Sequence, residues 1–223
     1  MPDTGAASWI VAVCSQKGGV GKSTLTMALA AAVADSAGRA LVVDVDPQAT
    51  TVEEAEKLTD PGFDVTHELD PAKLAQLSRL RRYDLILVDT PGSLEGQEVL
   101  EQVVDNAHFA VVPFVNEPPS RTPTQRTAAL IAEAGLPYAA VVNRIDPRSG
   151  GDAVLKARRE LEERGVPYFR SFVRSYTGYP DSLDAGKTVY QWRARYGANM
   201  REDISRVNAE LQRALGRIGS GVA

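Results

Sequence analysis

Short runs of apolar residues alternate with amphipathic or alanine-rich segments along the whole chain. Several runs are continuous stretches of Val, Ile and Leu, which is typical of strands buried on both faces of a parallel sheet. The predicted strands lie at residues 10–14, 40–45, 85–88, 109–115, 138–142 and 168–173. The predicted helices lie between them, at residues 23–34, 72–80, 97–104, 124–134 and 152–164. This alternation predicts a three-layer α/β fold, with a mostly parallel twisted sheet and helices on both of its faces.

One more helix is predicted near the end of the chain, at residues 200–218. Its narrow aliphatic face has acidic neighbours and no aromatic residue, which favours packing on the sheet over binding to a membrane. No apolar run approaches the roughly 20 residues that span a bilayer, and residues 1–8 lack the pattern of a secretory signal. We therefore expect one cytoplasmic domain over residues 1–223, with short tails at 1–8 and 216–223 and no membrane partner.

The first predicted strand leads into a glycine-rich loop with the sequence Lys17-Gly18-Gly19-Val20-Gly21-Lys22-Ser23-Thr24, and a predicted helix follows. This order is typical of a P-loop, in which backbone N–H groups and the positive end of the helix bind phosphate. In such a loop Lys22 contacts the β- and γ-phosphates, and the Ser23 hydroxyl binds Mg²⁺. The loop therefore predicts a site that binds ATP with Mg²⁺ and hydrolyses it.

The loop departs from the usual G-x-x-x-x-G-K-[ST] spacing, because Gln16 stands where the first glycine is expected. The sequence K-G-G-V-G-K-S resembles instead the deviant Walker A motif of the ParA/MinD family of ATPases. Asp44-Val45-Asp46-Pro47-Gln48 is similar to the D-x-D-P-Q motif of ParA-type proteins, and the strand that ends in Asp89-Thr90-Pro91 is similar to their Walker B strand. Within the family the chain most resembles the short plasmid-type ParA partition ATPases, because its P-loop strand begins at Trp9 and leaves no room for a helix-turn-helix.

The resemblance implies a catalytic role for each motif residue. Lys17 would reach the nucleotide of a second subunit, so that ATP is held between the two subunits of a dimer. Asp46 would orient the attacking water, and Ser23 would bind Mg²⁺, with Asp89 and Asp44 acting through its water ligands. Because Asp44 and Asp46 are two residues apart, strand alternation would direct both toward the phosphates.

The stretch Asn143-Arg144-Ile145-Asp146 bears on the choice of base. It resembles the guanine-reading N-K-x-D motif, with arginine in place of lysine. Since many ParA-like chains carry Asn-Arg here and bind ATP, the resemblance implies that Asn143 and Arg144 contact the nucleotide on its adenine side. GTP is the alternative.

Charge is unevenly distributed along the chain. Residues 1–140 contain 10 Lys+Arg and 19 Asp+Glu, a net charge of −9, whereas residues 141–223 contain 15 and 10, a net charge of +5. A basic region can face a polyanion, although a solvated helical surface has the same composition. The residues predicted to contact DNA phosphates are Arg170, Arg174, Lys187, Arg193, Arg195 and Arg201.

The resemblance implies a nucleoid-associated ATPase that dimerises on ATP and binds double-stranded DNA without sequence preference. With a centromere-binding adaptor of the ParB type, it would segregate plasmid or chromosomal DNA. The single cysteine, Cys14, is expected to be buried, and it excludes the iron–sulfur cluster of nitrogenase-type relatives. Two alternatives stay open: a ParA-like ATPase that positions a cargo other than DNA, and a MinD-like or metabolic P-loop enzyme that does not bind DNA.

Overall fold

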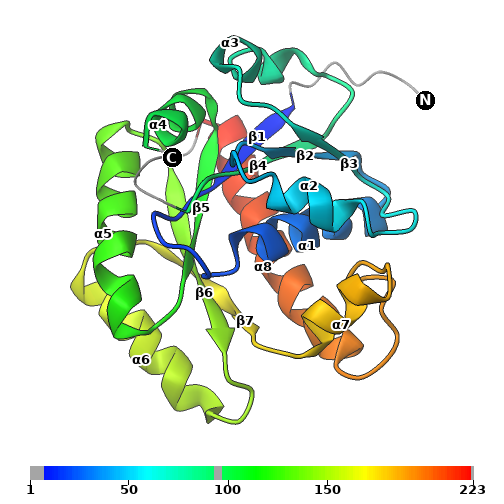
Figure 1. Ribbon diagram of the computed structural model, residues 1–223. Coiled ribbons are helices and arrows are strands. Elements are labelled where there is room, and N and C mark those ends of the chain that lie inside the picture. The colour runs from blue at the N-terminus through cyan, green and yellow to red at the C-terminus, as the bar shows by residue number, and fades with distance from the viewer. Residues whose placement is uncertain (1–7, 93–96, 222–223) are drawn as a thin grey trace.

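The computed structural model describes residues 8–92 and 97–221 (Figure 1). This part of the chain forms a seven-stranded sheet in the order β3-β2-β4-β1-β5-β6-β7, and every pair of neighbouring strands is parallel. The strands are β1 Trp9–Val13, β2 Ala40–Asp44, β3 Asp64–His67, β4 Leu85–Asp89, β5 Phe109–Phe114, β6 Tyr138–Ile145 and β7 Tyr168–Arg174. The predicted three-layer α/β fold is thus confirmed, and its sheet is parallel throughout.

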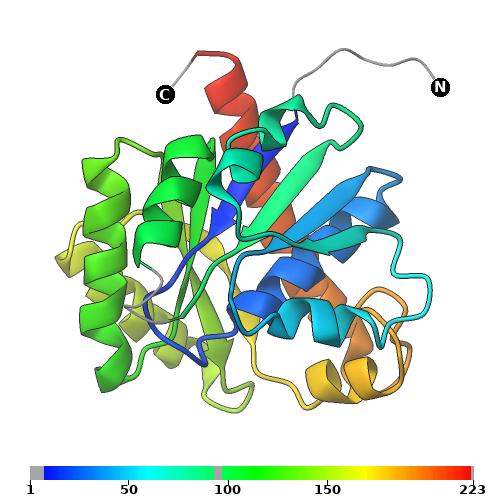
Figure 2. The ribbon, with the colours of Figure 1, turned by 45° about the horizontal axis from the view of Figure 1, so that its top comes forward.

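Helices cover both faces of this sheet (Figures 1 and 2). One apolar core lies between the sheet and α1 and α8, and a second lies between the sheet and α4, α5 and α6. The helices are α1 Lys22–Asp35, α2 Thr50–Ala55, α3 Pro71–Leu74, α4 Gln97–Asn106, α5 Pro118–Glu133, α6 Gly150–Glu163, α7 Gly178–Asp184 and α8 Gly197–Gly219, with a 3₁₀ turn, η1, at Leu77–Arg79.

Burial explains why these residues form these elements. Every residue of β2, β4 and β5 is buried, as expected for central strands covered on both faces. The small side chains in the middle of α1 are buried and allow the helix to lie close to the sheet and to α8. The prediction that the last helix packs on the sheet is confirmed, because Ile204, Val207 and Leu211 are fully buried.

Three short elements were not predicted, namely β3, α2 and α7. Strand β3 is at the edge of the sheet and is mostly exposed, so it lacks the apolar run that marks the central strands. The prediction of one helix at residues 72–80 was wrong, because α3 ends at Leu74 and a separate 3₁₀ turn follows at Leu77–Arg79. Only Leu74 and Leu77 are buried in this stretch, which is too little apolar surface to hold a longer helix against the core. Within the described ranges, no helix has the length and apolar character required to cross a membrane.

Candidate nucleotide-binding site

The loop between β1 and α1 owes its shape to two glycines. Gly19 and Gly21 have φ angles of 73° and 85°, in the left-handed region that other residues rarely adopt. Gly21 meets a second constraint, because a Cβ atom there would lie 2.8 Å from the Nδ2 atom of Asn143. The Gly21 carbonyl then accepts the N–H of Leu25 and starts α1. The backbone path therefore explains the second and third glycines of the K-G-G-x-G-K-S sequence.

Two side chains near the end of β6 donate hydrogen bonds to carbonyl groups of this loop. The Nδ2 atom of Asn143 donates to the Val20 carbonyl at 2.8 Å, and the Arg144 guanidinium donates to the Gly19 carbonyl. The C=O and N–H of one peptide point in opposite directions, so these bonds turn the next N–H groups toward the open side of the loop. The two residues predicted to contact the nucleotide therefore shape the phosphate-binding surface.

Lys22 lies at the start of α1 with a mostly buried side chain. Burial lowers the pKa of its ammonium group, while the nearby Asp89 and Asp46 carboxylates raise it. Its Nζ atom donates to the Lys17 carbonyl at 3.4 Å, a long bond that satisfies the ammonium poorly. At Gly92, a Cβ atom would lie 2.8 Å from this Nζ atom and 3.2 Å from the Gly18 nitrogen. The segment after β4 thus approaches the loop closely, and a phosphate fits the charge and the N–H donors gathered there.

Asp89, at the end of β4, is the centre of a group of hydroxyls. Its Oδ2 atom accepts bonds from Ser23 at 2.7 Å and Thr51 at 2.6 Å, and its Oδ1 atom is 3.4 Å from the Thr26 hydroxyl. Burial raises the pKa of this carboxyl to about 6, although the Ser23 and Thr51 hydroxyls and Lys22 lower it. A hydroxyl beside a buried carboxylate suits Mg²⁺, which prefers oxygen ligands and keeps several waters.

Sequence reasoning missed Thr26 and Thr51. Thr26 lies one helical turn after Lys22, on the side of α1 that faces the sheet, and this i, i+4 spacing could have identified it. Thr51 comes from α2, which was not predicted. Within the described part of the chain, no group of three or more His, Cys, Asp or Glu side chains could hold a metal ion. A cation here would therefore be held by hydroxyl, carboxylate, water and phosphate oxygens together.

The two aspartates after β2 have different surroundings. Asp44 is fully buried, and its carboxylate accepts the N–H groups of Asp46 at 3.0 Å, Thr51 at 2.9 Å and Val52 at 3.3 Å. Asp46 is half-buried and lies beyond β2, so strand alternation does not set its direction as expected; its Oδ1 atom accepts the Gln48 N–H. Asp44 therefore shapes the loop that carries Asp46 toward Lys22.

Lys17, at the start of the loop, and Cys14, which precedes the loop, also have defined environments. The Nζ atom of Lys17 lies 3.8 Å from the Glu117 carboxylate, which precedes α5. Cys14 is a buried free thiol, as predicted, and burial raises its pKa to about 12. The action of Lys17 on a second subunit stays a prediction.

A pocket of about 510 Å³ opens beside the loop, within the range of small-ligand sites. Gly19 and Gly21 line one side of it, and Asn143, Arg174 and Tyr176 line other parts of its wall. The pocket therefore extends from the phosphate loop to the carboxyl ends of β6 and β7, where a nucleoside is expected to lie. The Asp146 carboxylate, which would read guanine in an N-K-x-D motif, instead accepts bonds from the backbone and side chain of Arg148.

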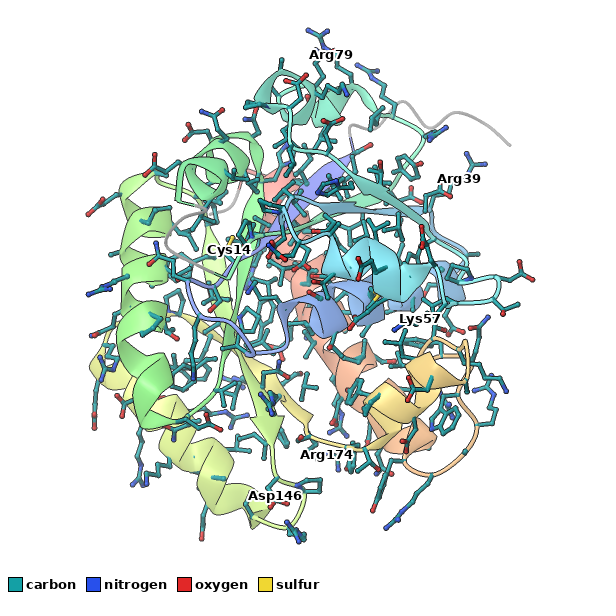
Figure 3. The ribbon with its side chains drawn as sticks, viewed as in Figure 1. Cys14, Arg39, Lys57, Arg79, Asp146 and Arg174 are labelled. Atoms are coloured by element: carbon teal, nitrogen blue, oxygen red, sulfur yellow. The ribbon has the colours of Figure 1, made fainter. Side chains whose placement is uncertain are left out.

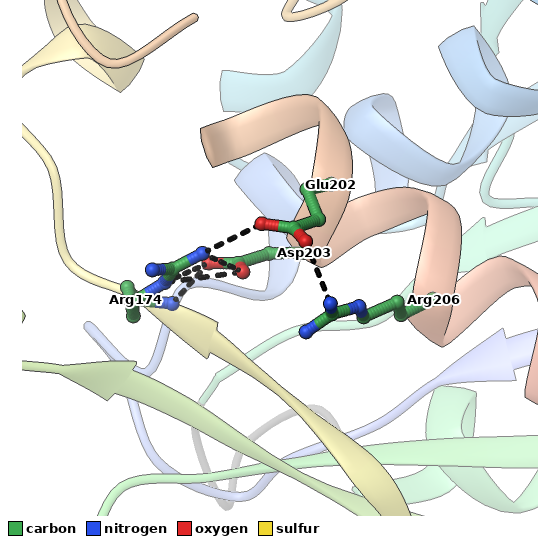
Figure 4. A network of polar contacts seen from close by, with 4 residues as sticks. All are labelled: Arg174, Glu202, Asp203 and Arg206. Atoms are coloured by element: carbon green, nitrogen blue, oxygen red, sulfur yellow. Dashed lines mark hydrogen bonds and ion pairs between the residues drawn. The ribbon is translucent and has the colours of Figure 1, made fainter. Parts of the chain in front are cut away.

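The residues predicted to contact DNA differ in their surroundings. Arg170, Lys187, Arg193 and Arg195 are exposed. Arg174 instead pairs with the buried Asp203 carboxylate at 2.6 Å and with Glu202, which also binds Arg206 (Figure 4). This network joins the end of β7 to α8, and Asp203 raises the pKa of Arg174 further above its usual value.

Arg201 is also half-buried, and it donates to the Trp192 carbonyl at 2.6 Å. Internal contacts therefore hold both of these arginines, and their contact with DNA stays a prediction. Figure 3 shows Arg174 and Asp146 in the lower part of the molecule, where β7 and β6 end, and Arg174 also lines the 510 Å³ pocket. Arg174 thus belongs to the wall of the nucleoside pocket.

Comparison with known proteins agrees with this geometry. The family model described as the CobQ/CobB/MinD/ParA nucleotide binding domain matches residues 11–189. The chain is 37% identical over 206 residues to the maintenance of carboxysome distribution protein A of Gloeobacter kilaueensis. The matched residues make up 92% of this chain and 94% of that protein.

Two solved structures have the same fold. The septum site-determining protein MinD of Pyrococcus horikoshii, complexed with Mg-ADP, superposes with a TM-score of 0.75 at 19% identity, over 94% of this chain and 98% of that one. An ATP complex of McdA from Cyanothece superposes with a TM-score of 0.69 at 13% identity, over 95% and 97% of the two chains. With the family model and the full-length relative, these findings show that the chain belongs to the CobQ/CobB/MinD/ParA family of nucleotide-binding domains.

Proposed function

We propose that this protein is an ATPase that distributes a large protein assembly over the nucleoid. The observation that carries the proposal is the 37% identity, over nearly the full length of both chains, to a protein named for carboxysome distribution. In this proposal, the ATP-bound dimer of the present protein binds DNA without sequence preference, and an adaptor protein on the cargo stimulates hydrolysis. The exposed Lys187, Arg193 and Arg195 support a polyanion-facing surface.

The chemistry of the site supports ATP with Mg²⁺ as the ligand. Phosphoryl transfer mainly requires positioning and neutralisation of charge. The loop N–H groups and Lys22 would hold the β- and γ-phosphates. Ser23 and Asp89 would hold Mg²⁺, which would neutralise phosphate charge. Asp46 orients the attacking water, while the three N–H groups bound by Asp44 fix the loop that carries it.

A second candidate is the segregation of plasmid or chromosomal DNA with a ParB-type partner. The observation that favours it is the pair of motifs Lys17–Ser23 and Asp44–Gln48, which resemble those of short plasmid-type ParA proteins. Both candidates use the same ATP site and the same DNA-bound dimer, since the fold does not determine the task. They differ in the cargo that the adaptor carries.

The test is complementation in cells that lack the gene, with a fluorescent version of the protein and its Lys22→Ala variant as the control. The distribution of large protein assemblies and the retention of resident plasmids are scored in the same cells. We expect deletion to cluster the assemblies and the native protein, but not the variant, to restore their even spacing. Evenly spaced assemblies after deletion, together with plasmid loss, would support the second candidate instead.

A further inference from the structure

A groove of about 320 Å³ lies at the end of the sheet opposite to the candidate ATP site. We call it the distal groove, and its wall includes Arg39, Phe63, Asp64, Arg82 and Tyr83. Arg39 immediately precedes β2, Arg82 lies three residues before β4, and these two parallel strands are neighbours. Both arginines therefore lie at the amino ends of the strands, whereas the phosphate loop follows the carboxyl end of β1.

The surroundings of the groove are rich in arginine. Arg79 and Arg81, which are exposed, lie in the same short segment as Arg82. Residues 38–40 and 79–84 contain four arginines, no lysine and one aspartate, Asp84. With Asp64 from the groove, four arginines against two aspartates give a local net charge of +2, although residues 1–140 as a whole carry −9. Figure 3 shows the Arg39 and Arg79 side chains extending outward from the upper part of the molecule.

Neighbouring groups already engage both aspartates. The Asp84 carboxylate accepts the backbone N–H of Arg39 at 2.8 Å, and the Asp64 carboxylate accepts the Tyr83 hydroxyl at 2.6 Å. The Arg82 guanidinium lies 4.8 Å from the centroid of the Tyr83 ring and donates to the Tyr83 oxygen at 2.6 Å. Arg82 is thereby held at the groove, and a cation fixed in this way loses less conformational entropy when it binds a ligand.

The other three arginines are available to a ligand. Within residues 8–92 and 97–221, the guanidinium groups of Arg39, Arg79 and Arg81 make no hydrogen bond or ion pair. A guanidinium group binds a carboxylate through two parallel hydrogen bonds, which an ammonium group cannot do. Arginine is also enriched at interfaces between proteins, where lysine is depleted. Arginines without lysine therefore favour the carboxylates of a protein as the ligand.

An apolar side chain lies beside these cations. Leu80 stands between Arg79 and Arg81, its carbonyl accepts the Tyr83 N–H at 3.3 Å, and 36% of its surface is exposed. A phosphodiester backbone offers no apolar group to such a side chain, whereas a peptide does. The combination fits an acidic peptide segment that also carries an aliphatic residue.

The position of the groove keeps it apart from the nucleotide chemistry. Strands β2 and β4 have five residues each, so the two ends of the sheet are about 17 Å apart. A ligand in the distal groove therefore does not contact a nucleotide at the phosphate loop. It also leaves the loop end of the molecule open to the second subunit proposed above.

We propose that the distal groove binds an acidic, extended segment of a partner protein. Arg39 and Arg82 pair with carboxylates of the segment, and Leu80 contacts an aliphatic side chain next to them. This inference goes beyond the proposed function, because it uses no residue of the nucleotide site and applies with and without ATP.

The test uses a fluorescent peptide with a repeated Glu-Glu-Leu pattern, and a control peptide in which every Glu is Gln. Fluorescence anisotropy gives the affinity, and NMR spectra of the isotope-labelled protein identify the amides that respond. The protein variants are Arg82→Lys and the double variant Arg39→Gln with Arg82→Gln. The matched control, Arg159→Gln with Arg213→Gln, removes the same charge from exposed positions of α6 and α8.

We expect the Glu peptide to shift the amide signals of Ala40 and Gly62, which line the groove. The double variant should bind it at least about tenfold more weakly, while the control stays within about twofold of the native protein. Arg82→Lys should also weaken binding, because lysine keeps the charge and loses the two parallel bonds. A saturating non-hydrolysable ATP analogue should leave the affinity unchanged.

No binding of the Glu peptide, or equal binding of the Gln peptide, would overturn the proposal. So would equal affinities in the double variant and the control, or shifts confined to other surfaces. A DNA duplex that displaces the peptide from the same arginines would assign the groove to phosphate instead. Thermal unfolding of each variant checks that its fold is intact. An absence of ATP-dependent DNA binding, measured separately, contradicts the proposed function alone.

Discussion

Lys22 and Asp46 lie near each other in the candidate nucleotide site, but their surroundings differ. Lys22 is buried at the start of α1, where burial lowers its pKa and an anion would restore the charged form. Asp46 is half-buried on a loop, with one carboxylate oxygen on the Gln48 N–H. We therefore propose that Lys22 binds phosphate and that Asp46 orients the attacking water.

We expect Lys22→Ala to weaken ATP binding by at least about 100-fold, because it removes a buried charge from the phosphates. Asp46→Ala should keep the ATP affinity within a few-fold and slow hydrolysis by about 100-fold or more. Fluorescent nucleotide titration measures the first quantity and phosphate release measures the second. Hydrolysis by Asp46→Ala at the rate of the native protein would contradict the proposed role of Asp46.

Motif spacing predicted some site residues and missed others for a physical reason. Lys22, Ser23 and Asp89 belong to local motifs, and the structure brings them together. Thr51 was missed, and so was the role of Gly92, because both depend on contacts between distant segments. Thr51 donates to Asp89, and Gly92 makes room for Lys22. Such contacts leave no periodic signal in the sequence.

Among the secondary-structure elements, α2 was missed for the same reason, namely that it depends on contacts between distant segments. The central strands and the longer helices were predicted, since each has enough apolar residues to set a period. Helix α2 has only six residues, two of them buried, and is held mainly by hydrogen bonds from Thr51 and Val52 to the Asp44 carboxylate. These bonds to a buried acid are tertiary contacts, so neither propensity nor pattern reveals them.

The pH dependence of stability tests the environment of α2. Glu54 lines a mainly apolar pocket of about 170 Å³ between α1, α2 and α7, and burial raises its pKa, although Lys57 opposes the shift. The folded state thus holds this proton more tightly than the unfolded chain does. The stability from Glu54 is complete below pH 4.5 and is lost as the pH rises through the raised pKa.

We therefore expect Glu54→Gln to raise the midpoint of thermal unfolding at pH 8 by a few degrees, and to have little effect at pH 4. Glu53→Gln, at an exposed position of the same helix, is the control. The measurement is thermal unfolding followed by circular dichroism without nucleotide. A variant that is less stable than the native protein at pH 8 would mean that the Glu54 carboxylate is stabilised in the fold.

For the molecule as a whole, we propose that ATP binding promotes DNA binding through formation of a dimer. Lys17 is the first residue of the phosphate loop, and the family resemblance implies that it contacts a second subunit. One subunit offers few phosphate contacts, so its DNA affinity is expected to be low. Two basic surfaces on one dimer make the second contact intramolecular, which can raise the affinity by roughly 10²–10⁴ without new contacts.

The measurement that tests this account most directly is the affinity for a duplex with and without ATP, using Asp46→Ala to prevent turnover and Lys17→Ala as the dimerisation control. We predict that ATP raises the DNA affinity of Asp46→Ala by at least about 100-fold. The same rise should be absent when Lys17→Ala is added, although that double variant still binds ATP. Equal DNA affinity with and without ATP, or an ATP-dependent rise that persists without Lys17, would contradict the account.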